Sequence, residues 1–154
     1  MSQPGMTIIV KNTTRIIAGF IALFGVYIAL TGHLSPGGGF AGGVILAAAA
    51  VLVVLAFGSG FAGRIVNEPK CHIWDGTGAM GFLVVALCGY ITGGFFVNFI
   101  PIGAAHHLLS GGMIPLANLA ILLKVGAGLA GAFVALSAFK YGRPRSIRRV
   151  GREL

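Results

Sequence analysis

Four long apolar blocks, separated by short polar or glycine-rich stretches, dominate the hydropathy pattern of this chain. A helix of about 20 apolar residues is long enough to cross the ~30 Å hydrocarbon core of a bilayer. The pattern therefore predicts an all-α membrane protein with four transmembrane helices, at residues 14–31, 38–57, 76–97 and 115–139. We treat residues 1–154 as one membrane domain, in which residues 140–154 form a basic tail.

Composition supports a bilayer environment, because 56% of the residues are hydrophobic and only 9% are charged. Soluble domains carry roughly 25% charged residues. The formal net charge of +8 would suit nucleic acid, but the cations flank the apolar blocks and form no basic face, so we expect no nucleic-acid binding. The first block shows no short apolar core with a cleavage site, and we interpret it as a retained helix.

The positions of Lys and Arg predict the orientation of the helices. All of them except Lys124 lie at the N-terminal tail, in the loop between the second and third blocks, or after the fourth block. The two other loops have none. Because cytoplasmic loops are enriched in Lys and Arg, we expect both termini to be cytoplasmic.

The stretch between the first two blocks, residues 32–43, reads Gly-His-Leu-Ser-Pro-Gly-Gly-Gly-Phe-Ala-Gly-Gly. Proline cannot continue a helix, and three glycines permit backbone geometry that a side chain forbids, so we predict a hinge. The glycine N–H groups at a helix start can hold an anion, a carbonyl oxygen or a water chain. Glycines spaced four apart also allow close helix packing. The hinge and packing residues are Pro36, Gly37, Gly38, Gly39, Phe40, Gly42 and Gly43.

Read as GHxxPGGGFxxG, this segment resembles the signature of the MnhB/MrpB family, whose members are small membrane subunits of multisubunit Na+/H+ antiporters, with relatives in membrane-bound hydrogenase and sulfane reductase complexes. The resemblance implies a single MnhB-like domain in a prokaryotic cytoplasmic membrane. It also implies a non-catalytic subunit of an Mrp-type antiporter, which helps to assemble and line the ion path. Its partners would be other membrane subunits, and Na+ and H+ would pass through the complex.

Asn118 departs from the family pattern, because many antiporter-type members carry an acidic residue in the corresponding stretch. An amide can hydrogen-bond a partner helix but exchanges no proton at neutral pH. The alternative of a subunit in a membrane-bound hydrogenase or sulfane reductase complex therefore stays open. A second alternative is an independent homo-oligomeric pore whose subunits pair through the glycine faces.

Lys124 and His33 are the other candidate residues for an ion pathway or a subunit contact. A lysine near the middle of a span costs roughly 3 kcal/mol to insert, so Lys124 should face a carboxylate, a water path or backbone oxygens. It is either a member of a proton or ion relay or a structural ion pair with a neighbouring subunit. His33 can shuttle protons near neutral pH or hydrogen-bond the turn beside it.

The three acidic residues, Glu68, Asp75 and Glu153, all lie outside the predicted spans, and Asp75 is placed to cap the third helix. With no acid in a span, neither a carboxylate Na+ site nor catalysis by paired carboxylates is expected there. We therefore predict that the chain is not an enzyme and needs neighbours to complete an ion path.

No metal site or cofactor is expected. The adjacent His106 and His107 would point apart on a helix and have no acidic or cysteine companion. Cys71, expected in a loop, and Cys88, expected in an apolar block, are too few for an iron–sulfur cluster.

Overall fold

The computed structural model describes residues 6–58, 68–103 and 110–139. Over these ranges the elements are α1 (Ile8–Leu30), α2 (Gly39–Phe57), α4 (Glu68–Cys88), the short 3-10 helix η1 (Gly89–Thr92) and α5 (Ile114–Phe139). Four segments are long and apolar enough to cross a membrane: Ile8–Leu30, Gly39–Phe57, Pro69–Thr92 and Ile114–Ser137. The predicted all-α membrane class with four spans is confirmed.

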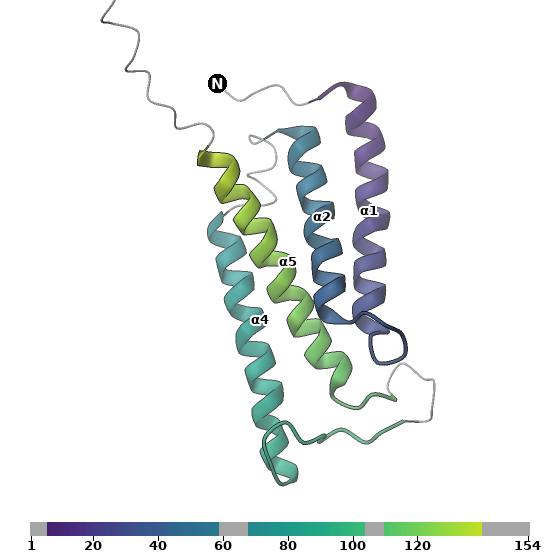
Figure 1. Ribbon diagram of the computed structural model, residues 1–154, viewed down its shortest axis with the longest axis vertical. Helices are drawn as coiled ribbons and strands as arrows, with labels where there is room; N and C mark the ends of the chain where they lie inside the picture. Colours follow the sequence, from purple (N-terminus) through teal and green to yellow (C-terminus); the bar gives the residue numbers. More distant parts are fainter. Residues whose placement is uncertain (1–5, 59–67, 104–109, 140–154) are drawn as a thin grey trace, which may run out of the picture.

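The four long helices run alternately in opposite directions, side by side (Figure 1). α2 packs between α1 and α5, and α4 packs against α5. The start of α1 and the end of α5 lie at the same end of the bundle, which we call the terminal end. The turn between α1 and α2 lies at the opposite end, together with the start of α5.

Small residues let α1 and α2 approach each other closely. A Cβ built on Gly25 would lie 2.9 Å from the carbonyl oxygen of Gly42, and a Cβ on Gly42 would collide with the carbonyl oxygen of Gly25. Ala29 also packs here and is fully buried. In a membrane, where lipid is as apolar as any side chain, such close backbone contact is a main source of helix association.

α1 begins at Ile8 and not at residue 14, so Lys11 and Arg15 lie inside the helix. The apolar residues Ile8 and Ile9 extend the span toward the terminus. A long basic side chain leans toward the start of its helix, which lets cations in the first turns reach water while their backbone stays in the span.

α4 differs most from the sequence prediction at its start. It begins at Glu68 instead of residue 76, so residues 68–75, which were expected in a loop, form the first two turns of the helix. Pro69 is compatible with this start because a first-turn proline interrupts no helical hydrogen bond. Cys71 is therefore a buried helical residue, and Asp75 lies inside α4, where it cannot cap the helix.

The regular part of α4 ends at Cys88 and not at residue 97, because the chain folds back on itself. Gly93 and Phe96 both have positive φ, 126° and 61°, and the N–H of Phe96 donates to the carbonyl oxygen of Ala86 at 3.1 Å. A Cβ on Gly89 would lie 2.6 Å from the backbone nitrogen of Val97. This glycine therefore makes room for the returning chain.

Asn98 joins the two ends of the connection between α4 and α5. Its Oδ1 accepts hydrogen bonds from the N–H groups of Ile100 at 3.3 Å and Met113 at 3.1 Å. Gly112, with φ 59°, lies directly against this side chain. His106 and His107 lie outside the described residues.

The contact between α1 and α2 is testable with one methyl group. We expect Gly42→Ala to lower the melting temperature of the purified chain in mild detergent, because its Cβ meets backbone in a packed interface and overpacking costs about 1–3 kcal/mol. Gly76→Ala is the matched control, since a Cβ there would have no atom of another helix within 4 Å. If the two variants melt alike, close packing at Gly42 is not needed for stability.

Candidate functional site

The turn between α1 and α2, residues 31–39, is hereafter the glycine turn. Its first half is closed by the carbonyl oxygen of Thr31, which accepts from the N–H groups of Leu34 at 2.8 Å and Ser35 at 3.0 Å. In its second half, Gly37 and Gly38 have φ values of +148° and +107°, which a residue with a side chain rarely adopts. The backbone path into α2 therefore requires glycine at both positions.

Asn118, in the second turn of α5, caps the start of α2. The N–H of Gly39 donates to its side-chain oxygen at 3.3 Å. The first N–H groups of a helix have no partner inside that helix, and here the side chain of another helix supplies one. A Cβ on Gly39 would collide with the backbone carbonyl oxygen of Asn118. One N–H of the predicted glycine patch, that of Gly39, thus binds a side-chain carbonyl oxygen of the same chain.

His33 lies at the same end of the bundle, half-buried in the glycine turn. A Cβ on Gly111 would lie 2.8 Å from Cγ of His33, so the imidazole packs against the turn that leads into α5. Pro36 and Phe40, in contrast, are exposed. The glycine turn therefore contacts the start of α5 in two places, through His33 and through Asn118.

The glycines of α2 face two different helices. Gly43 lies against α5, where a Cβ would be 2.8 Å from Cβ of Val125 and 3.0 Å from the carbonyl oxygen of Leu122. Gly42 instead faces Gly25 of α1. Both glycines and Gly39 are buried. Their spacing therefore serves helix packing within one chain.

Lys124 forms an ion pair with Asp75, its Nζ lying 3.0 Å from the Oδ1 of the carboxylate. Asp75 belongs to the span Pro69–Thr92 and Lys124 to the span Ile114–Ser137. The expectation that no acidic residue lies in a span is therefore wrong. Its cause is the early start of α4, which carries Asp75 into the helix.

Glycines make room for this ion pair between α4 and α5. A Cβ on Gly78 would lie 2.6 Å from the backbone nitrogen of Lys124, and a Cβ on Gly128 would lie 3.5 Å from Oδ1 of Asp75. The pair is not enclosed, because the side chains of Lys124 and Asp75 remain 50% and 36% exposed. Two opposite charges are thus presented together on the outer surface of the α4 and α5 helix pair.

The predicted site residues do not form one cluster. Asn118 faces α2, whereas Lys124 faces α4, and the axial rise between them is ~9 Å at 1.5 Å per residue. Asp75 was not predicted as the partner of Lys124. A usable signal was present, because Cys71, Asp75 and Gly78 share one helical face when the helix is extended back to Glu68.

A groove of about 200 Å³ adjoins the ion pair at its terminal side and is lined by Asp75, Cys71 and His72 of α4 and by small residues of α5. Within the described ranges, no three His, Cys, Asp or Glu residues lie close enough together to hold a metal ion. The groove therefore offers one carboxylate and one imidazole among small residues of two membrane-spanning helices.

Comparisons with known proteins agree with the architecture. The family model described as "Domain related to MnhB subunit of Na+/H+ antiporter" matches residues 9–131. An uncharacterized protein of Methanocaldococcus jannaschii is 35% identical over 150 residues, covering 87% of this chain and 53% of the relative. A Na(+)/H(+) antiporter subunit of Bacillus subtilis is 42% identical over 50 residues, covering 32% of this chain and 35% of the relative.

A solved structure is also similar. A chain in the membrane-bound sulfane sulfur reductase, an archaeal respiratory membrane complex, superposes with a TM-score of 0.74 at 33% identity, covering 88% of this chain and 60% of that chain. The present chain thus spans about half the length of the Methanocaldococcus relative, at 53%, and a smaller share of the Bacillus relative.

The cap on α2 gives a second prediction. Asn118→Ala should destabilise the chain by about 1–3 kcal/mol, because the N–H of Gly39 loses its acceptor in a part-buried place. Asn118→Asp should retain the cap, since a carboxylate accepts the same hydrogen bond. Melting in mild detergent and hydrogen exchange of the Gly39 amide measure both effects, with the exposed Asn12→Ala as control. Unchanged exchange at Gly39 in Asn118→Ala would show that the cap is dispensable.

Proposed function

Because the chain belongs to the MnhB family, we propose that it is a non-catalytic membrane subunit of an Mrp-type multisubunit Na+/H+ antiporter module. The family match over residues 9–131 and the Bacillus relative named as an antiporter subunit support this function. Its role is to assemble with larger membrane subunits and to line part of the path that Na+ and H+ take. The distribution of Lys and Arg supports a cytoplasmic location of the terminal end.

The exposed ion pair is the observation that carries this proposal. A charged group in contact with hydrocarbon is costly, and buried charges in membrane proteins mark contacts or ion pathways. The Lys124 ammonium has three N–H donors, and within the described ranges it donates to Asp75 alone. Its remaining donors and half-exposed surface require water or polar groups other than those of the described residues. We therefore place the neighbouring subunit, or a hydrated path, at this face.

Two roles of the pair remain within this proposal. As a structural element, it neutralises both charges while α4 and α5 insert and while a neighbour docks. As a member of an ion path, the pair would open when a proton or a Na+ ion competes with Lys124 for the carboxylate of Asp75. The second role requires an acid within a span, and the position of Asp75 in the candidate span Pro69–Thr92 supports it.

A sulfane reductase type of complex is the alternative, supported by the structural similarity at a TM-score of 0.74 and by the neutral Asn118. The same chain and the same ion pair would then serve a redox-driven complex. A homo-oligomeric pore was expected to pair its subunits through the glycine faces. Gly39, Gly42 and Gly43 are instead buried inside the chain and cannot pair with a second copy.

The ion pair gives the third prediction. Lys124→Ala and Asp75→Asn should each lower either the amount of assembled complex or the Na+-dependent proton movement in everted membrane vesicles. The expected decrease is about tenfold or more, because each variant leaves one charge without its partner. Lys11→Ala, outside the α4 and α5 face, is the control. The proposal fails if both single variants assemble and transport like the parent chain.

The double variant Lys124→Met with Asp75→Leu separates the two roles. If the pair is structural, removing both charges restores assembly and transport together, as for other ion pairs replaced by apolar residues of similar size. If the pair lies in the ion path, assembly returns while Na+-dependent proton movement stays lost.

The subunits that copurify with the chain in mild detergent give a further test. Large multi-span subunits without redox centres are expected for an antiporter module. Added subunits with iron–sulfur clusters or nickel would instead assign the chain to a redox-driven complex. A chain that purifies alone and exchanges Na+ for H+ in vesicles would contradict both assignments.

A further inference from the structure

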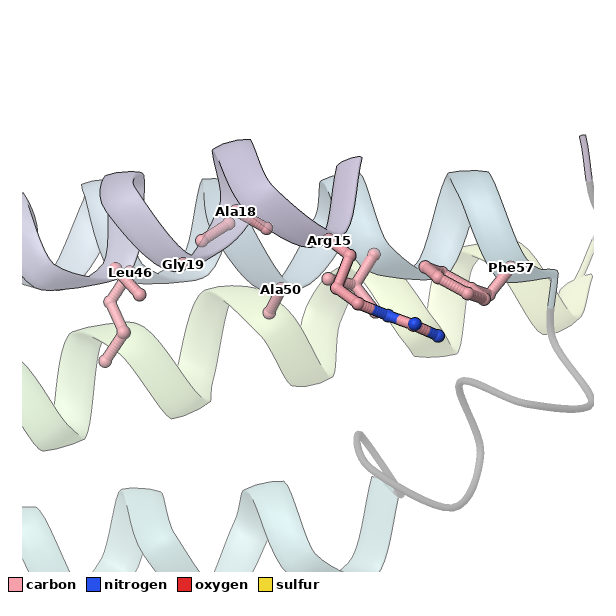
Figure 2. A pocket seen from close by; sticks show the side chains of 9 residues that line it. Arg15, Ala18, Gly19, Leu46, Ala50 and Phe57 are labelled. Atoms are coloured by element: carbon pink, nitrogen blue, oxygen red, sulfur yellow. The ribbon is translucent and has the colours of Figure 1, made fainter. Parts of the chain in front are cut away.

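A second feature lies away from the ion pair, in the groove between α1 and α2. This groove has a volume of about 420 Å³, within the range of ligand-binding cavities. Its lining is apolar apart from one cation, Arg15. Its walls include Ala18, Gly19, Leu46, Ala50 and Phe57. Figure 2 shows Arg15 and Phe57 near one end of the groove and Leu46 near the other.

The length of the groove matches one leaflet of a bilayer. From Leu46 to Phe57, α2 rises ~16 Å at 1.5 Å per residue. Half of a ~30 Å hydrocarbon core is ~15 Å. The end with Arg15 is near the last residue of α2, at the terminal end of the bundle. The groove thus runs from headgroup level toward the middle of the membrane.

Arg15 is suited to hold an anion at this end. Its guanidinium carbon lies 5.7 Å from the centre of the Phe57 ring, which fixes the cation over an aromatic face. In the described part of the chain the one ion pair joins Lys124 and Asp75, so no described carboxylate neutralises Arg15. A guanidinium offers a planar set of N–H donors that matches the oxygens of a phosphate.

A neighbouring groove repeats the arrangement. It has a volume of about 260 Å³, shares Leu46 and Ala50 with the first groove, and carries Lys70 and Trp74 from the first turns of α4. Lys70 therefore provides a second cation at the terminal end, where α4 begins. Both apolar grooves thus carry a cation toward the terminal end of the bundle, as a site for a lipid headgroup requires.

We propose that the groove between α1 and α2 binds an acyl chain of an anionic phospholipid, with the lipid phosphate held by Arg15. A partner helix fits less well, because a 16 Å length of helix occupies roughly 1,200 Å³. Such a helix would rest on the rim and would have to supply its own acid to Arg15. A phospholipid provides both the thin apolar chain and the anion, and the surplus of cations at this end favours an anionic headgroup.

The test uses the full-length chain, purified in mild detergent and stripped of lipid. Native mass spectrometry during titration with dioleoyl phosphatidylglycerol should show saturable binding, tighter than that of dioleoyl phosphatidylcholine. Arg15→Gln should weaken phosphatidylglycerol binding about fivefold, equivalent to the ~1 kcal/mol of one cation at an anionic surface. Lys11→Gln removes the same charge one turn earlier on α1, outside the groove, and should bind like the parent chain.

A filled groove gives an independent arm of the test. A Cβ on Gly19 would have no atom of another helix within 4 Å. The Phe side chain of Gly19→Phe can therefore occupy the groove without a clash in the bundle. This variant should lose saturable lipid binding, while Gly76→Phe, on open surface of α4, should keep it. Melting in detergent verifies that both variants fold.

Three results would overturn the proposal. The first is equal phosphatidylglycerol binding by Arg15→Gln and Lys11→Gln, and the second is parent-like lipid binding by Gly19→Phe. The third is full displacement of the lipid by glycerol phosphate, because it would show that the apolar groove is not used. The assay contains no transport step, so its failure leaves the proposed antiporter function untouched.

Discussion

An ion pair between two membrane-spanning helices is the interaction on which this structure most depends. Nζ of Lys124 lies 3.0 Å from Oδ1 of Asp75, and each charge lowers the free-energy cost of keeping the other in a membrane span. Beside the pair, Gly78 lets the backbones of α4 and α5 approach closely, because a Cβ there would lie 2.6 Å from the backbone nitrogen of Lys124. Since both charges stay partly exposed, the same interaction that joins two helices also presents two charges on their outer surface.

α5 connects the two halves of the molecule. One side of α5 receives α2 through Asn118, whose side chain completes the start of that helix, and another side receives α4 through Lys124. The charged surface of the α4 and α5 pair and the apolar groove of α1 and α2 are therefore built on different helices. This separation is consistent with a membrane component that meets a protein neighbour at one place and lipid at another.

Hydropathy was sufficient to predict the helical class, the number of spans and the place of the glycine turn, because these depend on local composition. It failed at the start of α4, where Glu68, Lys70 and Asp75 lower the average although the backbone is already helical. The contacts of the candidate site are tertiary: Gly39 and Asn118 are 79 positions apart, and Asp75 and Lys124 are 49 apart. The chemistry of each residue was readable from the sequence, but its partner depended on how the helices pack.

The most direct test of this account is the distance between Nζ of Lys124 and Cγ of Asp75, measured by solid-state NMR on the isotope-labelled chain in lipid bilayers. The 3.0 Å contact between Nζ and the carboxylate oxygen predicts measurable dipolar coupling between Nζ of Lys124 and Cγ of Asp75. Absence of this coupling would show that Lys124 and Asp75 are not paired in the bilayer and would contradict the ion pair.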